Sequence, residues 1–312
     1  MAKRRIALIG VGKIARDQHL PVIDGSDAFE LVATVSTSGA RHRDLPVFAT
    51  PGELYRAMPG LDAVSVCTPP EVRSGIAHEA LDAGLDVLLE KPPAPTLSEF
   101  AGVVAHARDS GRVLFQTWHS QHNAAVDETR RILAEEGVAS LRIDWRESVR
   151  KWHPGQDWVW QPGGFGVCDP GINALSILAK VMPFPVTVRQ ARLTVPENRQ
   201  TPVDVAITFA SREAHRPEIS AGFNWLEESG EVWSFTVETR SGRRLLLTRG
   251  GAALSVDGVE TVAEPATEYE QIYARFAELL DARASEADDT PLRWVADAFT
   301  VGSRETTDAF HW

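Results

Sequence analysis

Hydrophobic and polar positions in the first 120 residues alternate between short apolar runs and longer segments with helical spacing. A short apolar run bounded by polar or turn residues is typical of a buried strand. Apolar residues that recur every three or four positions are typical of an amphipathic helix. Strands and helices that follow one another in this way indicate βαβ units and a parallel sheet. The predicted strands are 5–9, 30–35, 61–66, 86–89 and 112–115, and helices are predicted at 72–83 and 97–110.

The pattern changes beyond this point, where a helix at 123–134 precedes a series of strand-like segments. Strands that succeed one another without helices between them favour antiparallel pairing. We therefore expect a doubly wound α/β domain over 1–120 and an α+β domain over 121–312, the latter with a large, mostly antiparallel sheet and helices. The C-terminal helix could pack back on the first domain. The later predicted strands are 138–151, 187–195, 204–210, 219–225, 233–239 and 244–248, and the closing helices are 268–282 and 292–300.

Composition and charge remove several classes of function. There are 32 Lys and Arg against 43 Asp and Glu, a net charge of −11. This excess of acid argues against a nucleic acid or an anionic membrane as the main partner. The two cysteines, Cys67 and Cys168, are too few for a disulfide framework or a Cys-x-x-Cys zinc site. The apolar run 6–9 is too short for a signal peptide, and no run is long enough to span a membrane, so we expect a cytoplasmic protein.

The first predicted strand ends in a G-x-G-x-x-A pattern, Gly10-Val-Gly12-Lys13-Ile14-Ala15. The first glycine permits a tight turn, the second lets a pyrophosphate approach the backbone, and the small third residue lets the next helix pack closely. Glycines also occur in ordinary turns. The position of this pattern, after a strand and before a helix, favours a Rossmann dinucleotide site with Gly10, Gly12, Lys13 and Ile14 as contacts.

The end of the second predicted strand bears on the choice of dinucleotide. An acid usually lies there and binds the ribose 2′-hydroxyl of NAD. This chain has Ser36 and Thr37 instead, with Arg41 and Arg43 nearby and no carboxylate before Asp44. The pattern slightly favours NADP over NAD, with Ser36 and Thr37 as contacts, although the arginines could equally belong to a solvated loop.

Two further strand ends carry candidate ligand-binding residues. One strand is followed by Cys67-Thr68-Pro69 and another by Glu90-Lys91-Pro92. Ligands bind open α/β sheets at the carboxyl ends of the strands. We therefore expect all three residues of the first segment, together with Glu90 and Lys91, to contact the cofactor. Lys91 could also hydrogen-bond a reacting oxygen. The alternative is a Glu90–Lys91 ion pair on the rim of a loop.

The loop from Trp152 to Asn173 is the most informative stretch of the second half. It contains three tryptophans within nine residues, Trp152, Trp158 and Trp160. Indole faces suit the C–H faces of a sugar ring, but large rings also anchor loops to a core. Asp169 and Asn173 would share one face of a helix that begins at Asp169. Asp169 followed by proline is also a typical helix N-cap, and the two roles could coexist. Cys168 is expected to be a small buried residue.

The motifs together resemble the Gfo/Idh/MocA family of oxidoreductases. The resemblance rests on the G-x-G-x-x-A pattern, Thr68-Pro69, the segment 80–84 and, most specifically, Glu90-Lys91-Pro92. It implies a nicotinamide dinucleotide cofactor, with Lys91 between cofactor and substrate. Two positions depart from the family pattern. Arg73 stands where the family has His after Thr-Pro, and Asn173 stands where it commonly has His, so an amide would replace a proton acceptor there.

The segments 12–21, 152–156, 169–177, 291–299 and 307–310 narrow the resemblance to the L-arabinose / D-galactose 1-dehydrogenase branch of this family. By this resemblance, Lys91, Asp169 and Asn173 are catalytic or substrate-contacting residues. His119, Glu147, Trp152 and His153 are further substrate-binding candidates.

The implied reaction is oxidation of an aldose at C1 to an aldonolactone. Asp169 is the candidate base and Lys91 the candidate donor to the C1 oxygen; which of them takes the proton is open. A dehydrogenase for another sugar or for inositol is one alternative, and a catalytically silent dinucleotide-binding regulator is another. No metal is expected, because His119 and His122 lack an evident third ligand. A small-molecule sugar is the expected partner, and a homo-oligomer is left open.

Overall fold

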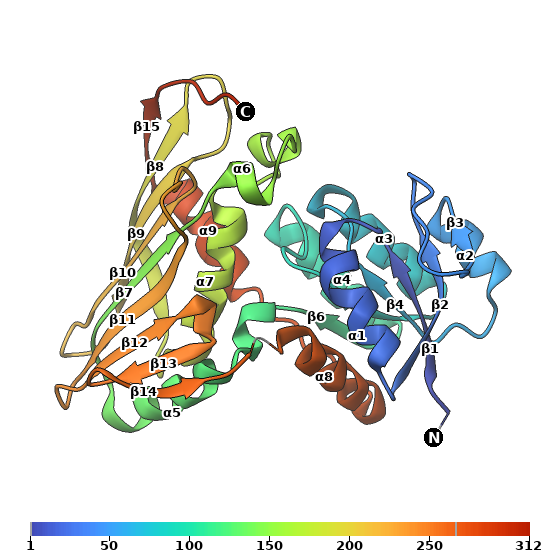
Figure 1. Ribbon diagram of the computed structural model, residues 1–312, viewed down its shortest axis with the longest axis horizontal. Coiled ribbons are helices and arrows are strands. Elements are labelled where there is room, and N and C mark those ends of the chain that lie inside the picture. Colours follow the sequence, from blue (N-terminus) through green and yellow to red (C-terminus); the bar gives the residue numbers. More distant parts are fainter. Residues whose placement is uncertain (1, 266) are drawn as a thin grey trace. The chain divides into compact units, whose positions relative to one another are not determined.

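Six parallel strands form the sheet of the first half, in the order β3-β2-β1-β4-β5-β6 (Figure 1). The computed structural model describes residues 2–265 and 267–312. This strand order is that of a doubly wound dinucleotide-binding sheet, with its reversal between β1 and β4. The predicted fold class is therefore confirmed. The strands are β1 (Arg4–Ile9), β2 (Phe29–Val35), β3 (Val47–Phe48), β4 (Ala63–Val66), β5 (Asp86–Leu89) and β6 (Leu114–Gln116).

The chain divides into two units. The first comprises Met1–His119 and Glu268–Asp289, and the second Ser120–Thr267 and Thr290–Trp312. The late helix α8 (Glu268–Ala282) therefore belongs to the first unit. Its apolar side chains recur with helical spacing and lie in one core with residues of β1 and of the helix after it.

Helices cover the six-stranded sheet. A π-helical turn, η1 (Ala15–His19), leads into α1 (Leu20–Gly25), and α8 contacts α1. The other helices are α2 (Pro51–Ala57), α3 (Pro70–Asp82) and α4 (Leu97–Asp109). The sequence analysis did not predict β3 or α2, because a strand of two residues and a helix of seven leave too few periodic positions.

The second unit contains a nine-stranded sheet in the order β14-β13-β12-β11-β7-β10-β9-β8-β15. Most neighbours are antiparallel, as predicted, but β7 pairs parallel with β10 and β8 parallel with β15. The strands are β7 (Val138–Arg146), β8 (Val186–Pro196), β9 (Asp204–Ser211), β10 (Glu218–Asn224), β11 (Val232–Thr239), β12 (Arg244–Thr248), β13 (Ala253–Val256), β14 (Val259–Ala263) and β15 (Ser303–Thr307).

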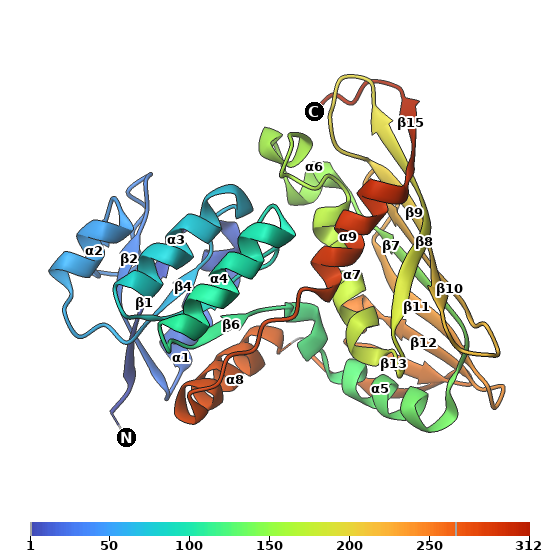
Figure 2. The ribbon, with the colours of Figure 1, turned by 180° about the vertical axis from the view of Figure 1, so that it is seen from behind.

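Helices α7 and α9 lie side by side on one face of this sheet, as both ribbon views show (Figures 1 and 2). The predicted strand 138–151 is wrong at its end: β7 stops at Arg146, and a short helix follows. The helices and turns are η2 (His119–His122), α5 (Ala124–Glu136), α6 (Val149–Trp152), η3 (Asp157–Trp160), α7 (Cys168–Val181), η4 (Arg249–Gly251) and α9 (Thr290–Val301).

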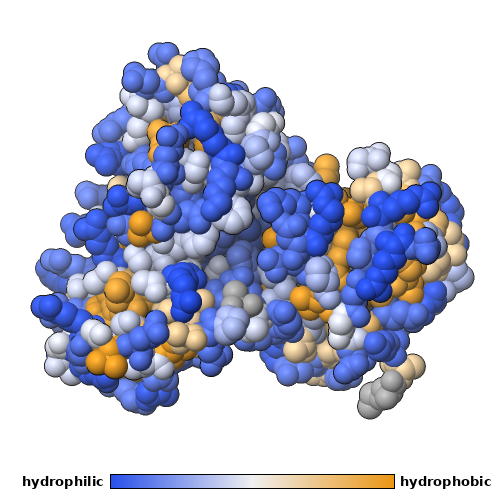
Figure 3. All heavy atoms as spheres, in the orientation of Figure 1, coloured by the Kyte–Doolittle hydropathy of each residue, from blue (hydrophilic) through white to orange (hydrophobic). Residues whose placement is uncertain are grey.

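The surface is largely polar. Hydrophilic residues cover much of the face drawn in Figure 3, in keeping with the net charge of −11. In the described part of the chain, no helix is both long and apolar enough to cross a membrane. Both cysteines are free and buried. Burial raises the pKa of the Cys168 thiol to about 12, so this residue packs as a small apolar side chain, as expected.

Candidate functional site

The turn after β1 has the geometry of a dinucleotide cradle. Gly10 has φ +96°, and a Cβ there would lie 2.9 Å from both the backbone N and Cγ2 of Thr68. Glycine is therefore required. A Cβ on Gly12 would meet no atom within 4 Å, so space is open above that backbone. Ala15 is fully buried where the helix meets the sheet. The three positions of the motif thus fit a pyrophosphate lying over the turn.

The neighbouring strand end fits a ligand as well. The hydroxyl Oγ1 of Thr68 is buried, and it has no hydrogen-bond partner within the described residues. Buried hydroxyls without a partner are rare, and a bound ligand is one group that satisfies them. Cys67, just before it, is buried at the carboxyl end of β4. The predicted contacts Cys67, Thr68 and Pro69 therefore adjoin the turn at Gly10, at the point where the strand order reverses.

The end of β2 carries hydroxyls rather than carboxylates. Ser36 Oγ accepts a hydrogen bond from the Ala40 N–H at 3.1 Å, while Thr37 is exposed. Arg43 forms an ion pair with Asp24 at 2.6 Å, so one of the two nearby arginines is already partnered. Arg41 is exposed.

Arg73, the first departure from the family pattern, is buried in the first unit at 4% exposure. Its guanidinium donates to the carbonyl of Glu90 at 2.8 Å and also to the carbonyls of Pro92 and Thr68. One side chain therefore ties together the two loops that follow β4 and β5. The fork of N–H donors on arginine suits this task, because it reaches several carbonyls at once.

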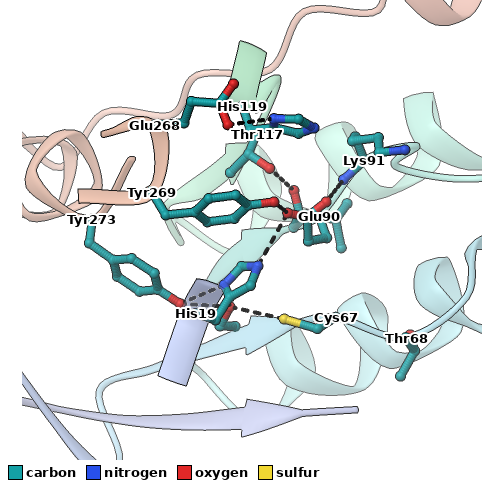
Figure 4. A network of polar contacts seen from close by, with 12 residues as sticks. His19, Cys67, Thr68, Glu90, Lys91, Thr117, His119, Glu268, Tyr269 and Tyr273 are labelled. Atoms are coloured by element: carbon teal, nitrogen blue, oxygen red, sulfur yellow. Dashed lines mark hydrogen bonds and ion pairs between the residues drawn. The ribbon is translucent and has the colours of Figure 1, made fainter. Parts of the chain in front are cut away.

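Glu90 is not part of an ion pair on a loop rim. Its carboxylate is 2% exposed and turned inward (Figure 4). Oε1 accepts from the Tyr269 hydroxyl at 2.7 Å and lies 3.2 Å from His19 Nε2, while Oε2 accepts from the backbone N–H of Lys91 at 2.6 Å. The Lys91 side chain extends away from these groups (Figure 4). The alternative interpretation of a Glu90–Lys91 side-chain pair on a rim is therefore wrong.

Two of the buried groups around Glu90 have shifted pKa values, and the shifts favour opposite charges on neighbouring side chains. Burial raises the pKa of the Glu90 carboxyl, but the hydrogen bond and charge of His19, with His119 and Arg73, hold it well below its usual range. Burial lowers the pKa of His19, but Cys67, Tyr273 and the bond to Glu90 raise it well above its ordinary value. The two directions agree, and describe an imidazolium beside a carboxylate.

His119 lies next to these buried groups, in the first unit. Its Nδ1 is 3.2 Å from Glu268 Oε2, and its ring stacks on Tyr269 at 5.7 Å between centroids. Burial lowers the pKa of His119, but Glu268 and Glu90 raise it above its ordinary value. The imidazole of this predicted sugar contact therefore carries a proton more readily than a free histidine.

In the second unit, Asp169 and Asn173 share a face of α7, as their spacing predicts. The predicted N-cap is wrong. The helix begins at Cys168, with Val167 as its cap residue, and no side chain caps it. Asp169 is instead inside the first turn, 4% exposed, and its Oδ2 lies 3.5 Å from Nε2 of His153. The structure thus places Asp169 beside a predicted sugar-binding residue rather than on the helix amides.

Glu147, another predicted sugar contact, is 6% exposed directly after β7. Its carboxylate accepts the indole N–H of Trp225 at 3.3 Å and that of Trp233 at 3.0 Å. The His153 ring packs on Trp225 at 5.4 Å between centroids. Glu147 and His153 therefore both contact Trp225 in the second unit.

The three tryptophans of the loop separate into two groups. Trp160 is buried and packs against Trp225 and Phe310, so its role is to anchor the loop. Trp152 and Trp158 are half-buried. Trp152 donates to Glu231 at 2.6 Å, and Trp158 donates to Gln156 at 3.0 Å.

Sequence reasoning missed His19, Tyr269 and Glu268 as part of the site, and it assigned no role to Arg73. Tyr269 and Tyr273 lie on the apolar stripe of α8. Because buried tyrosine hydroxyls need hydrogen-bond partners, their position on that stripe indicated a buried polar contact. Their partners are 179 to 254 positions away in sequence, which no local pattern reveals. No group of three His, Cys, Asp or Glu residues in the described chain could hold a metal ion.

Comparison with known proteins decides the family. A model described as an oxidoreductase family with an NAD-binding Rossmann fold matches residues 4–117. A galactose 1-dehydrogenase of Pseudomonas fluorescens is 42% identical over 308 residues, which cover 98% of each chain. The chain belongs to the Gfo/Idh/MocA family of oxidoreductases. This confirms the resemblance inferred from its motifs. A D-glucoside 3-dehydrogenase of Escherichia coli is 30% identical over 195 residues, 58% of this chain and 54% of that one.

Comparison with solved structures agrees with this assignment. The crystal structure of a D-galactose-1-dehydrogenase from Rhizobium etli is 45% identical, covers 100% of this chain and 99% of its own, and superposes with a TM-score of 0.94. A 3-ketoreductase from Actinomadura kijaniata, solved with TDP-benzene and NADP, is 18% identical, with a TM-score of 0.84 over 98% of this chain and all of its own. The second likeness shows the fold alone.

Proposed function

We propose that this chain oxidises D-galactose and L-arabinose at C1 to the corresponding lactones, with NADP or NAD as the electron acceptor. Whole-length similarity to two galactose 1-dehydrogenases supports the substrate class. L-Arabinose is D-galactose without the exocyclic CH₂OH group, so one pocket with room beyond C5 accepts both sugars. The first unit binds the dinucleotide, and the second contributes residues that bind the sugar.

The observation that carries the proposal is the position of Asp169. Its carboxylate is buried, it does not cap the helix, and it lies 3.5 Å from His153. We assign it the proton of the anomeric hydroxyl, since a carboxylate can act as a general base whereas the amide of Asn173 cannot. Asn173, on the same helix face, orients the sugar by hydrogen bonds.

Lys91 is assigned to the oxygen on C1. A lysine at the carboxyl end of a strand in a doubly wound sheet stands where ligands bind. Its ammonium group donates a hydrogen bond and stabilises the negative charge that develops on the oxygen as the proton leaves. When bound, the nicotinamide accepts the hydride from C1. His119, Glu147, Trp152 and His153 are assigned to binding and orienting the sugar ring.

Contacts to the dinucleotide are assigned to Gly10, Gly12, Lys13 and Ile14, to Ser36 and Thr37, and to the segment around Thr68. In the segment Glu90-Lys91 they are assigned to the main chain and the Lys91 side chain, because the Glu90 carboxylate is turned inward. The open backbone at Gly12 and the buried hydroxyl of Thr68 support this assignment. NADP is favoured over NAD, because Ser36 and Thr37 offer hydroxyls rather than a carboxylate that would repel a 2′-phosphate. We also propose the cytoplasm as its compartment, since both cysteines are free thiols.

A panel of aldoses tests the proposal. Purified protein is mixed with D-galactose, L-arabinose, D-glucose or myo-inositol, with NAD⁺ and NADP⁺ in separate wells, and reduced nicotinamide is followed by absorbance. We expect turnover with the first two sugars and little or none with the others. Turnover of D-glucose or myo-inositol alone would replace the substrate assignment. Absence of turnover by protein that binds a dinucleotide would favour a regulator.

A further inference from the structure

The buried groups around Glu90 come from four separate stretches of the first unit. We call His19, Ser65, Glu90, Tyr269 and Tyr273 the Glu90 cluster (Figure 4). Each member is fully buried or nearly so. None of the roles assigned above to the dinucleotide or the sugar involves His19, Ser65 or the two tyrosines.

Hydrogen bonds link all members of the Glu90 cluster. With both nitrogens protonated, His19 donates from Nε2 to Glu90 at 3.2 Å and from Nδ1 to the Tyr273 hydroxyl at 2.8 Å. Tyr273 then donates to Ser65 at 3.1 Å. Tyr269 donates to Glu90 Oε1 at 2.7 Å. The Ser65 hydroxyl also lies 3.3 Å from His19 Nδ1 and 3.6 Å from Cys67 Sγ, so each of these buried polar groups has a partner.

One contact of the Glu90 cluster reaches the main chain of Lys91. The oxygen Oε2 of Glu90 accepts the backbone N–H of Lys91 at 2.6 Å, while Oε1 is taken by His19 and Tyr269. A charged acceptor makes this bond stronger than a bond between neutral groups. The bond fixes the peptide plane from which the Lys91 side chain begins.

The same segment is held from its other side. Arg73 donates to the carbonyls of Glu90 and Pro92, the residues on either side of Lys91. The main chain at Lys91 is thus fixed at its amide by Glu90 and at the flanking carbonyls by Arg73. Few surface loops have their main chain held at three consecutive residues. Such restraint suits a side chain whose amine must be placed within a fraction of an ångström of a reacting atom.

We propose that Glu90 is a positioning residue for Lys91. His19 and Tyr269 hold the Glu90 carboxylate, and the carboxylate in turn sets the direction in which the Lys91 amine is presented. This inference rests on the proposed function of Lys91 and adds three residues that act through it. It also explains why a helix late in the chain, α8, belongs to the first unit: it supplies Tyr269 and Tyr273.

A direct test observes Lys91 without requiring turnover. The chain has five lysines, Lys3, Lys13, Lys91, Lys151 and Lys180. Reductive methylation with ¹³C-formaldehyde gives each a resolvable methyl resonance, and Lys91→Arg assigns that of Lys91. We expect the Lys91 resonance to shift in Glu90→Gln and in Tyr269→Phe, and the other four to stay in place. Tyr269→Phe removes one hydroxyl and keeps the ring, so it serves if Glu90→Gln folds poorly.

Tyr55→Phe is the matched control. It also removes one buried tyrosine hydroxyl from the first unit, but one that lies on α2 and has no hydrogen-bond partner among the described residues. It should move none of the five resonances. An unmoved Lys91 resonance in both Glu90→Gln and Tyr269→Phe would overturn the proposal. Movement of all five would also overturn it, because it would show a general effect on the fold.

Kinetics give a second readout. Glu90→Gln should lower kcat on the preferred aldose by about 10-fold or more, while the Kd for the dinucleotide changes by less than about 2-fold. An equal loss in both would assign Glu90 to cofactor binding and overturn the positioning role. If the unmutated chain turns over no aldose, the proposed function fails, and the methyl resonances still decide whether Glu90 positions Lys91.

Discussion

Nε2 of His153 lies 3.5 Å from Oδ2 of Asp169, which joins the loop after β7 to the first turn of α7. The contact accounts for an aspartate that is buried in a helix yet caps nothing. Such a contact offsets part of the cost of burying the carboxylate. Under the proposed assignment of Asp169 as the base, the family's usual His, replaced here by Asn173, is not needed for that step.

Asp169→Asn is the sharpest change at this position, because it keeps the shape and removes the base. We expect kcat on D-galactose to fall by about 10²–10⁴-fold, with a much smaller change in KM. Steady-state kinetics measure both. The control is Asp157→Asn, an exposed aspartate of the same loop region paired with Arg199, which should retain wild-type rates. A variant Asp169→Asn with near-normal kcat would transfer the role of base to another group.

Glu147→Gln tests the buried carboxylate between two indoles. An amide presents an NH₂ group to one of the two N–H donors, Trp225 or Trp233, and leaves a buried donor unsatisfied. The free energy of unfolding should fall by about 1–3 kcal/mol, as measured in urea. Glu231→Gln is the matched control, because Glu231 also accepts an indole N–H, from Trp152, but lies at the surface. Equal losses in the two variants would contradict this account of Glu147.

Arg73→Lys tests whether one guanidinium holds two loops. Lysine carries the charge but cannot span the carbonyls of Thr68, Glu90 and Pro92 with one nitrogen. Urea unfolding should show a loss of about 1–3 kcal/mol for each carbonyl left without a donor. Arg56→Lys, at an exposed position of α2, should change the free energy of unfolding by less than about 0.5 kcal/mol. Indistinguishable stabilities would show that Arg73 does not fasten these loops.

Ser36→Asp tests the basis of the cofactor preference. A carboxylate after β2 would repel the 2′-phosphate of NADP and accept the ribose hydroxyls of NAD. The ratio of kcat/KM for NADP⁺ to that for NAD⁺ should fall by about 10-fold or more. Asparagine is nearly the same size as aspartate but carries no charge. Ser36→Asn should therefore leave the ratio within about 3-fold of wild type. If Asn shifts the ratio as far as Asp does, the charge is not what selects the dinucleotide.

The sequence alone predicted much of the fold. The strand at 86–89 and the helix at 268–282 coincide with β5 and α8, because both have clear periodicity and sharp polar boundaries. The strand predicted over 138–151 extended too far, since Ser148-Val149 continue its apolar spacing although the chain turns into α6. Period-two patterns do not reveal where a chain leaves a sheet.

The site was predictable only where its residues lie in local motifs. The turn at Gly10 and the Glu90-Lys91 segment were identified from sequence, since fixed spacing carries their geometry. The role of Glu90 as an inward-facing acceptor was not, because His19 and Tyr269 reach it from positions 71 and 179 residues away. Likewise, spacing predicted the shared face of Asp169 and Asn173 but not the contact with His153.

The central claim, oxidation at C1, is tested most directly with D-galactose carrying deuterium on that carbon. The protein is incubated with this sugar and NADP⁺ or NAD⁺, and the reduced dinucleotide is examined by mass spectrometry. The account predicts that the reduced dinucleotide carries the deuterium. Unlabelled reduced dinucleotide would show that the hydride leaves from another carbon, as the name of the related D-glucoside 3-dehydrogenase implies for that enzyme, and would contradict the assignment of Asp169 and Lys91 to the anomeric hydroxyl.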